Sequence, residues 1–99
     1  MKLLFTKQAL ESFEEALTFI SNDVSYNKLM EIRNSVLQAA EMLIENPFIG
    51  QKEIYLEHMG LDHRRIIEGN FKIIYRVIDQ VIYITDIFDT RQKPDEMKG

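Results

Sequence analysis

The sequence contains no cysteine and no long apolar run. Without cysteine, the chain can form no disulfide, no thiolate nucleophile and no cysteine-ligated zinc site. No stretch approaches the ~20 consecutive apolar residues of a membrane-spanning helix. The three apolar residues Leu3–Phe5 are also too few for a signal peptide. We therefore expect a cytoplasmic protein with no membrane attachment.

The patterns that several enzyme classes require are missing as well. The four glycines are scattered at positions 50, 60, 69 and 99, so no glycine-rich loop can hold a phosphate. No serine lies in a nucleophile elbow. His58 and His63 lie with Glu57 and Asp62 in a predicted loop-to-strand passage rather than on one helix face, which is not the spacing of a metal site. We expect no metal and no cofactor.

The composition is that of a folded domain, with 45% hydrophobic and 28% charged residues in a chain of 99. This length fits one domain over residues 1–99 and is short for a two-domain enzyme with an enclosed cofactor cleft. The net charge of −4 gives no general reason to expect nucleic-acid binding. The charge is uneven, however: residues 1–62 carry 5 basic and 10 acidic side chains, and residues 63–99 carry 7 basic and 6 acidic. The second half is therefore the place to look for a local basic site.

Periodicity predicts a short strand and two helices in the first half of the chain. After the strand over residues 2–5, Thr6 is a candidate N-cap for a helix over 7–21. Apolar residues at i, i+3, i+4 and i+7 place one stripe on this helix and another on a helix over 25–46, which Asn46-Pro47 ends. The short turn between them predicts an antiparallel helical hairpin, which needs a further apolar surface to cover its stripes.

Three strands are predicted to supply that surface. After an irregular connection over 48–62, runs rich in β-branched and aromatic residues occupy 63–68, 71–78 and 81–88, separated by two-residue turns. The element order is therefore β-α-α-β-β-β. The predicted fold class is α+β, an antiparallel sheet packed against the helical hairpin. The polar residues 89–99 are expected to form a turn and a frayed end.

Strand alternation predicts which side chains share a face of the sheet. With two-residue turns, Arg76 lies opposite Tyr83 and Ile74 opposite Thr85. The face away from the helices then collects basic and aromatic side chains over an isoleucine floor: His63, Arg65, Lys72, Arg76, Tyr83 and Thr85, with Ile67, Ile74 and Ile87. This face fits either a solvated surface held by cross-strand pairs or a site for an anionic partner, such as a phosphate backbone or an acidic protein surface.

The helix-facing side of the predicted sheet is apolar apart from two charges. Arg64 and Asp86 fall on this side in the same register. Leaving either charge alone there would be costly, so we expect the two to form a buried ion pair with a structural role.

The open face also carries groups suited to RNA cleavage. RNA supplies its own 2′-hydroxyl nucleophile, so a protein needs only a base, cations for the charged transition state and a proton donor. The candidate catalytic residues are His63, Arg65, Lys72 and Arg91.

The run from His63 to Val77 resembles the core hairpin of the RelE/ParE toxin family. The run from Ile82 to Pro94 resembles the last strand and the arginine-containing exit of its plasmid-stabilisation, ParE-like branch. Thr6-Lys7-Gln8-Ala9 and the later Asn46-Pro47 also fit, so the resemblance spans nearly the whole chain. It implies the toxin of a type II toxin–antitoxin system, which a cognate antitoxin protein wraps and holds inactive.

The resemblance leaves two activities open. ParE-like members inhibit DNA gyrase, whereas RelE-like members are ribosome-dependent mRNA endonucleases. Arg65 falls where RelE-like toxins carry a catalytic-site lysine, Lys72 at a phosphate-binding arginine, and Arg91 at the arginine after the last strand. The tyrosine expected six residues later is Met97 here, and a net charge of −4 steers poorly toward ribosomal RNA.

We therefore favour the gyrase inhibitor and keep the ribosome-dependent mRNA endonuclease as the alternative, so the sequence leaves open whether the protein is an enzyme. The expected target-binding residues are Arg65, Lys72, Arg76, Tyr83 and Arg91. The oligomeric state and the identity of the antitoxin stay open.

Overall fold

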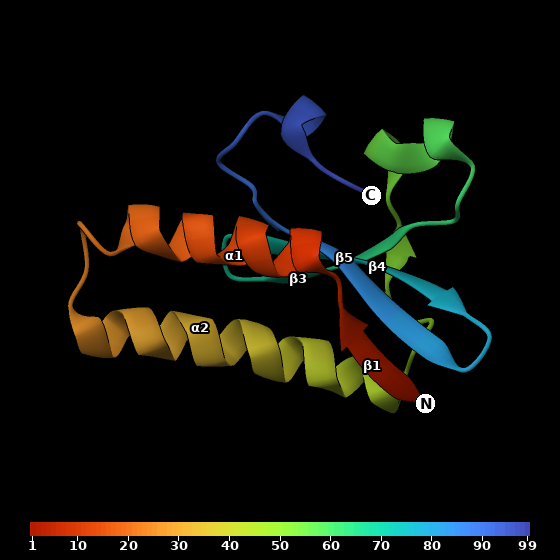
Figure 1. The fold of residues 1–99 in the computed structure, drawn as a ribbon, viewed down its shortest axis with the longest axis horizontal. Coiled ribbons are helices and arrows are strands. Elements are labelled where there is room, and N and C mark those ends of the chain that lie inside the picture. The colour runs from red at the N-terminus through yellow and green to blue at the C-terminus, as the bar shows by residue number, and fades with distance from the viewer.

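The computed structural model describes residues 1–99 and has the predicted α+β fold class (Figure 1). A helical hairpin, α1 (Lys7–Ile20) and α2 (Tyr26–Glu41), follows the first strand, β1 (Lys2–Phe5), and the 3₁₀ turn η1 (Met42–Ile44) extends it. The remaining elements in chain order are β2 (Gln51–Lys52), the 3₁₀ helix η2 (Ile54–Met59), β3 (Arg64–Glu68), β4 (Phe71–Ile78), β5 (Val81–Asp89) and the 3₁₀ turn η3 (Pro94–Glu96). None of the helices has the length and apolar character needed to cross a membrane.

Local chemistry explains where the helices begin and where the hairpins turn. The hydroxyl of Thr6 caps α1 by accepting a hydrogen bond from the Ala9 N–H at 3.1 Å, as predicted, and Ser25 caps α2 in the same way. Both hairpin turns begin at a residue with positive φ, Gly69 at 58° and Asp79 at 56°. Glycine adopts this conformation without steric cost, and aspartate tolerates it better than most residues do.

The sheet has five strands in the order β1-β5-β4-β3-β2, and it departs from the prediction at both edges. At one edge, β1 runs parallel to β5, so the sheet is mixed rather than wholly antiparallel. The helical hairpin carries the chain across the sheet, and such a crossover permits parallel pairing. At the other edge, β2 pairs with β3 inside the segment that was predicted to be irregular.

The main core lies between the helical hairpin and one face of the sheet. The ring of Phe13 on α1 meets that of Phe71 on β4 edge to face, with 5.7 Å between ring centroids. The buried members come from both helices, η1 and the two central strands: Ala9, Phe13, Leu17, Ile20, Val36, Ala40, Leu43, Phe71, Ile73, Tyr75, Ile82, Ile84 and Ile87. The predicted apolar stripes therefore meet the predicted apolar face of β4.

A β-bulge in β5 changes the register predicted for its second half. Arg76 lies opposite Tyr83, as alternation predicts. Ile74, however, pairs with Asp86 rather than with Thr85, because the register shifts beside Ile74. Thr85 is the extra residue of the bulge, and such a residue exchanges the faces of everything beyond it.

The side of the sheet that was predicted to be open is covered by other parts of the chain. Ile87 belongs to the main core instead of the opposite floor. Phe88 takes its place on the other face, in a second core that draws on η2 and the C-terminal segment: Leu56, Ile74, Phe88 and Met97. Both segments lie on the opposite side of the sheet from the helical hairpin (Figure 1). The face is therefore not open as predicted, because η2 and the C-terminal segment pack on it.

Candidate functional site

Three cations on the sheet face away from the helices bind one connecting segment. We call this segment, residues 51–61, the strap; it contains β2 and η2. Arg65, Lys72 and Arg76 each donate a hydrogen bond to it. The three cations of the predicted basic cluster therefore lie together, but they bind the strap of the same chain.

Glu53 is the central anion of the strap. Its side chain is fully buried, and its Oε1 lies 3.0 Å from the Nζ of Lys72 and 3.9 Å from the Nε of Arg65. Its Oε2 accepts a hydrogen bond from the Tyr55 N–H at 3.2 Å. The ammonium of Lys72 also stands 5.4 Å from the centroid of the Tyr55 ring. Glu53 thus occupies the position that an external anion would take beside Lys72.

The other two cations bind oxygen atoms at the two ends of the strap. The guanidinium of Arg65 donates to the backbone carbonyl of Lys52 and, at 3.0 Å, to the side-chain oxygen of Gln51. Arg76 donates from Nε to the carbonyl of Leu61 at 2.8 Å. Arginine suits this task because its planar group can satisfy several acceptors at once.

His63 is buried at the edge of the same face. Only 3% of its surface is exposed, its Nε2 lies 3.2 Å from the carbonyl oxygen of Gly99, and its Nδ1 has no partner. Burial lowers the pKa of His63, and the hydrogen bond to Gly99 offsets this only in part. A histidine covered in this way cannot reach a substrate proton without movement of the C-terminal residues.

Arg91 lies apart from the strap. Its guanidinium makes a two-point ion pair with the carboxylate of Asp89, with Nη2–Oδ2 at 2.7 Å and Nε–Oδ1 at 2.9 Å. This ion pair holds the pKa of Asp89 below its ordinary value. The hollow beside β2 is lined by Arg65 and Lys72, whereas Arg91 lines the hollows beside α1 and α2. The structure therefore does not bring the four candidate catalytic residues to one point.

Arg64 and Asp86 do not form the predicted ion pair. Arg64 donates to the carbonyls of Phe48 and Gly50, the latter at 2.7 Å, and its guanidinium carbon lies 5.2 Å from the centre of the Phe48 ring. The bulge moves Asp86 to the outer edge of β5, where its Oδ2 accepts the Lys98 N–H at 2.9 Å. One inserted residue thus separated two charges that simple alternation had placed together.

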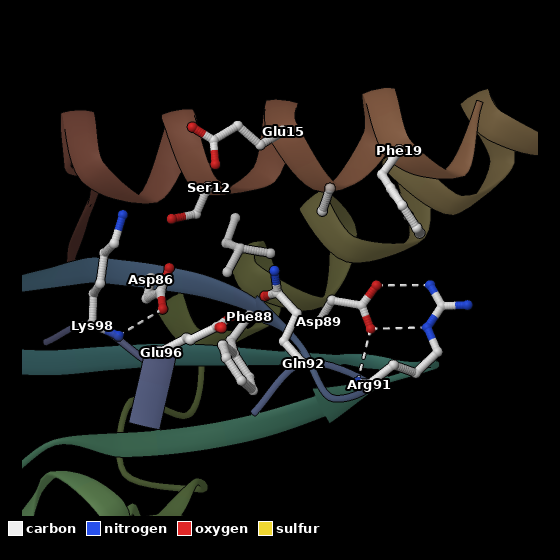
Figure 2. A pocket seen from close by; sticks show the side chains of 12 residues that line it. Ser12, Glu15, Phe19, Asp86, Phe88, Asp89, Arg91, Gln92, Glu96 and Lys98 are labelled. Carbon is white, nitrogen blue, oxygen red and sulfur yellow. Dashed lines mark hydrogen bonds and ion pairs between the residues drawn. The ribbon is translucent and has the colours of Figure 1, made fainter. Parts of the chain in front are cut away.

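A pocket of about 610 Å³ lies at that outer edge, and we call it the β5-edge pocket. Its walls are one side of α1, the second half of β5 from Asp86 to Asp89, and the C-terminal segment from Arg91 to Lys98 (Figure 2). Asp86 is buried and its Oδ1 has no close hydrogen-bond partner; burial raises its pKa, which the Lys98 N–H and, from further away, the Ser12 hydroxyl offset in part. Sequence reasoning missed this pocket because its walls combine α1 with segments far from it in the chain.

Sequence reasoning also missed Glu53. It lies in a segment without periodicity, where no pattern distinguishes a buried acid from the exposed Glu57 nearby.

No group of three or more histidine, aspartate or glutamate side chains is placed to hold a metal ion. The chemistry available on this face is therefore the chemistry of fixed cations and a buried carboxylate.

Comparison with known proteins was made for sequence and for structure. The family model described as "ParE toxin of type II toxin-antitoxin system, parDE" matches residues 3–94. The sequence search of the curated proteins found no match. Among solved structures, the chain is similar to one described as "Chromosomal ParDE TA system from P. aeruginosa", with a TM-score of 0.68 and 16% identity over 88% of this chain and 92% of that one. At this identity, the similarity shows a shared fold.

Proposed function

The chain belongs to the ParE toxin family of type II toxin–antitoxin systems, and on this premise we propose that it inhibits DNA gyrase by binding and is neutralised by a cognate antitoxin. In this proposal, residues 1–99 form a single toxin domain that acts in the cytoplasm. The observation that carries the choice of activity is Glu53, the buried carboxylate that already occupies the cations of the sheet face.

RNA cleavage would require those cations to be free. A phosphate that took Lys72 from Glu53 would leave a buried carboxylate without its main counter-charge, at a cost of about 3–5 kcal/mol. His63 is not available either, because it is buried, and Arg91 lies apart from Arg65 and Lys72. These contacts favour a protein that acts by its surface over one that performs phosphodiester chemistry.

Met97 supports the same choice. It stands at the position where the resemblance to RelE-like toxins led us to expect a tyrosine, and it is buried in the second core. A thioether can neither transfer a proton nor act as a phenol does in general acid–base chemistry. The net charge of −4 adds a further argument, because favourable steering toward ribosomal phosphate needs positive charge.

Arg91 is more exposed than two of the other proposed target-binding residues. Its side chain is 56% exposed, against 22% for Arg65 and 19% for Lys72. We therefore expect Arg91→Ala to weaken gyrase inhibition more than Lys93→Ala, a nearby exposed control. Arg65, Lys72, Arg76 and Tyr83 belong to the proposal as secondary contacts through their exposed parts.

The deciding experiment compares two assays on the same purified protein. We expect it to block supercoiling by DNA gyrase and to leave mRNA on translating ribosomes intact. Unchanged supercoiling at large molar excess would contradict the proposal. New mRNA ends that disappear in the Lys72→Ala/Arg91→Ala double variant, and persist in the control Lys28→Ala, would favour the endonuclease alternative.

Neutralisation by an antitoxin has its own test. Large apolar side chains are exposed around the strap and its flanks, a surface typical of a protein with a partner: Phe48, Ile49, Ile54, Tyr55 and Ile67. We expect expression of this chain alone to arrest growth, and co-expression of a short neighbouring reading frame to restore it. Normal growth with the chain alone, at a verified protein level, would count against a toxin.

A further inference from the structure

The outer edge of β5 has a neighbouring strand along only half of its length. β1 pairs with residues 81–84, and the Thr6 N–H and Gln8 amide extend the contacts to the carbonyls of Ile84 and Thr85. From Asp86 to Asp89 no strand pairs with this outer edge; the four residues are buried, with 1–6% of their surface exposed, and the β5-edge pocket opens beside them (Figure 2). An unpaired strand edge is a template for an extended segment of another chain.

The charge of the pocket is predominantly negative. Asp89 and Arg91 neutralise each other through their two-point ion pair. The carboxylates that remain are those of Glu15, Asp86 and Glu96, and they are opposed only by the ammonium of Lys98. Lys98 contributes its backbone N–H to Asp86, but its ammonium makes no ion pair within 4 Å.

Asp86 is the acid of this pocket whose carboxylate has room for a further hydrogen-bond donor. It is 2% exposed, one carboxylate oxygen is held by the Lys98 N–H, and the other makes no close hydrogen bond, although the nearby Ser12 hydroxyl helps to lower the pKa of Asp86. Ser12 of α1 faces it across the pocket (Figure 2). A buried acceptor without a donor is uncommon in folded proteins, and a donor that reached it would relieve that deficit. An apolar surface adjoins it, since Phe19 is 72% exposed on the same wall.

We propose that the β5-edge pocket binds an extended segment of a partner protein that places a lysine or arginine side chain against Asp86 and an apolar side chain against Phe19. The backbone of the segment lies along the unpaired half of β5. The incoming cation pairs with the free oxygen of the Asp86 carboxylate, while the Lys98 backbone N–H keeps its hydrogen bond to the other oxygen. An acidic segment is excluded by the same charges.

The test is a titration of the isotope-labelled protein, observed by NMR, with the peptide acetyl-Leu-Arg-Val-Leu-amide. The matched ligand carries citrulline in place of arginine, which keeps the shape and removes the charge. We expect shifts to cluster in α1 from Ser12 to Phe19 and in β5 from Asp86 to Asp89. The citrulline peptide should bind about tenfold more weakly, the change expected when one charge-assisted hydrogen bond is lost.

Variants locate the cation site. Asp86→Asn should weaken binding of the arginine peptide by about the same tenfold factor, whereas Lys98→Gln, which removes the competing cation of the chain, should tighten it. Glu14→Gln, an exposed acid that does not line the pocket, is the control and should change nothing.

Three results would overturn the proposal: equal affinity for the two peptides, shifts centred on the strap, or no shifts at millimolar peptide. The comparison of the two peptides uses the unmodified protein, so it stands even if Asp86→Asn fails to fold. It involves neither gyrase nor antitoxin, so its outcome is independent of the proposed function.

Discussion

Replacing Glu53 with alanine should destabilise the protein more than any change to an exposed acid. The substitution leaves Lys72 without its partner at 3.0 Å and Arg65 without its partner at 3.9 Å. Removing one member of a buried ion pair costs about 3–5 kcal/mol, because the remaining charge stays desolvated. About a fifth of each cation's side chain is exposed and can regain water, so we take the lower end, about 3 kcal/mol.

That loss is easily measured in a domain of this size. A change of 1 kcal/mol shifts the melting temperature by about 4–8 °C here, so Glu53→Ala should melt about 12–24 °C lower than the parent protein. The assay is unfolding by urea and by heat, followed by circular dichroism. Glu53→Gln keeps the shape and one acceptor, and we therefore expect a smaller loss than with alanine.

Glu57→Ala is the matched control, because Glu57 is exposed in the same strap. We expect it to change the free energy of unfolding by at most about 0.5 kcal/mol. Strong salt should leave the difference between the two variants in place, since a buried pair is screened much less than a surface pair. If Glu53→Ala costs no more than Glu57→Ala, the ion pair does not hold the strap and the reasoning is refuted.

Three other groups allow predictions of the same kind. Burial lowers the pKa of His63 below 6.5, so the stability of the fold should be full above this pH and fall as the pH drops through 6.5. In urea unfolding, His63→Gln should remove this pH dependence, whereas His58→Gln, at an exposed histidine, should leave it unchanged. Arg91 holds the pKa of Asp89 below 3.8, so its contribution should be lost as the pH falls below 3.8, and Asp89→Asn should flatten the stability profile there. The buried hydroxyl of Tyr75 accepts a backbone N–H at 2.9 Å, so Tyr75→Phe should cost about 1–3 kcal/mol in thermal unfolding, and exposed Tyr26→Phe close to nothing.

The helices and hairpins were predictable because their signals are local. The stripe on α1 and the cap at Thr6 depend only on residues three or four apart, and both are present. The turn at Gly69-Asn70 lies between strands that pair in the predicted register, with Ile67 opposite Lys72. Periodicity also identified the face of β4 that joins the main core.

The register of β5 was predictable only as far as its bulge. Alternation placed Arg76 opposite Tyr83 correctly and then failed two residues later, at Thr85. A bulge is not visible in the alternation of this run, because apolar and β-branched residues stand on both sides of Thr85 and suit either face of the sheet. The bulge also changed the site, because it places Asp86 beside Lys98 while Arg64 binds the carbonyl of Gly50.

The family resemblance and the set of basic residues came from the sequence alone, since residue types and their order carry both. What those residues bind was decided by the tertiary structure. Arg65, Lys72 and Arg76 stand in the predicted strands, but their partners in the strap lie 13 to 19 positions earlier in the chain. Whether a cation faces solvent or a buried carboxylate depends on such contacts between distant segments, and no local pattern records them. The net charge of −4 was countable from the start, but the neutralisation of its basic part became visible only in the fold.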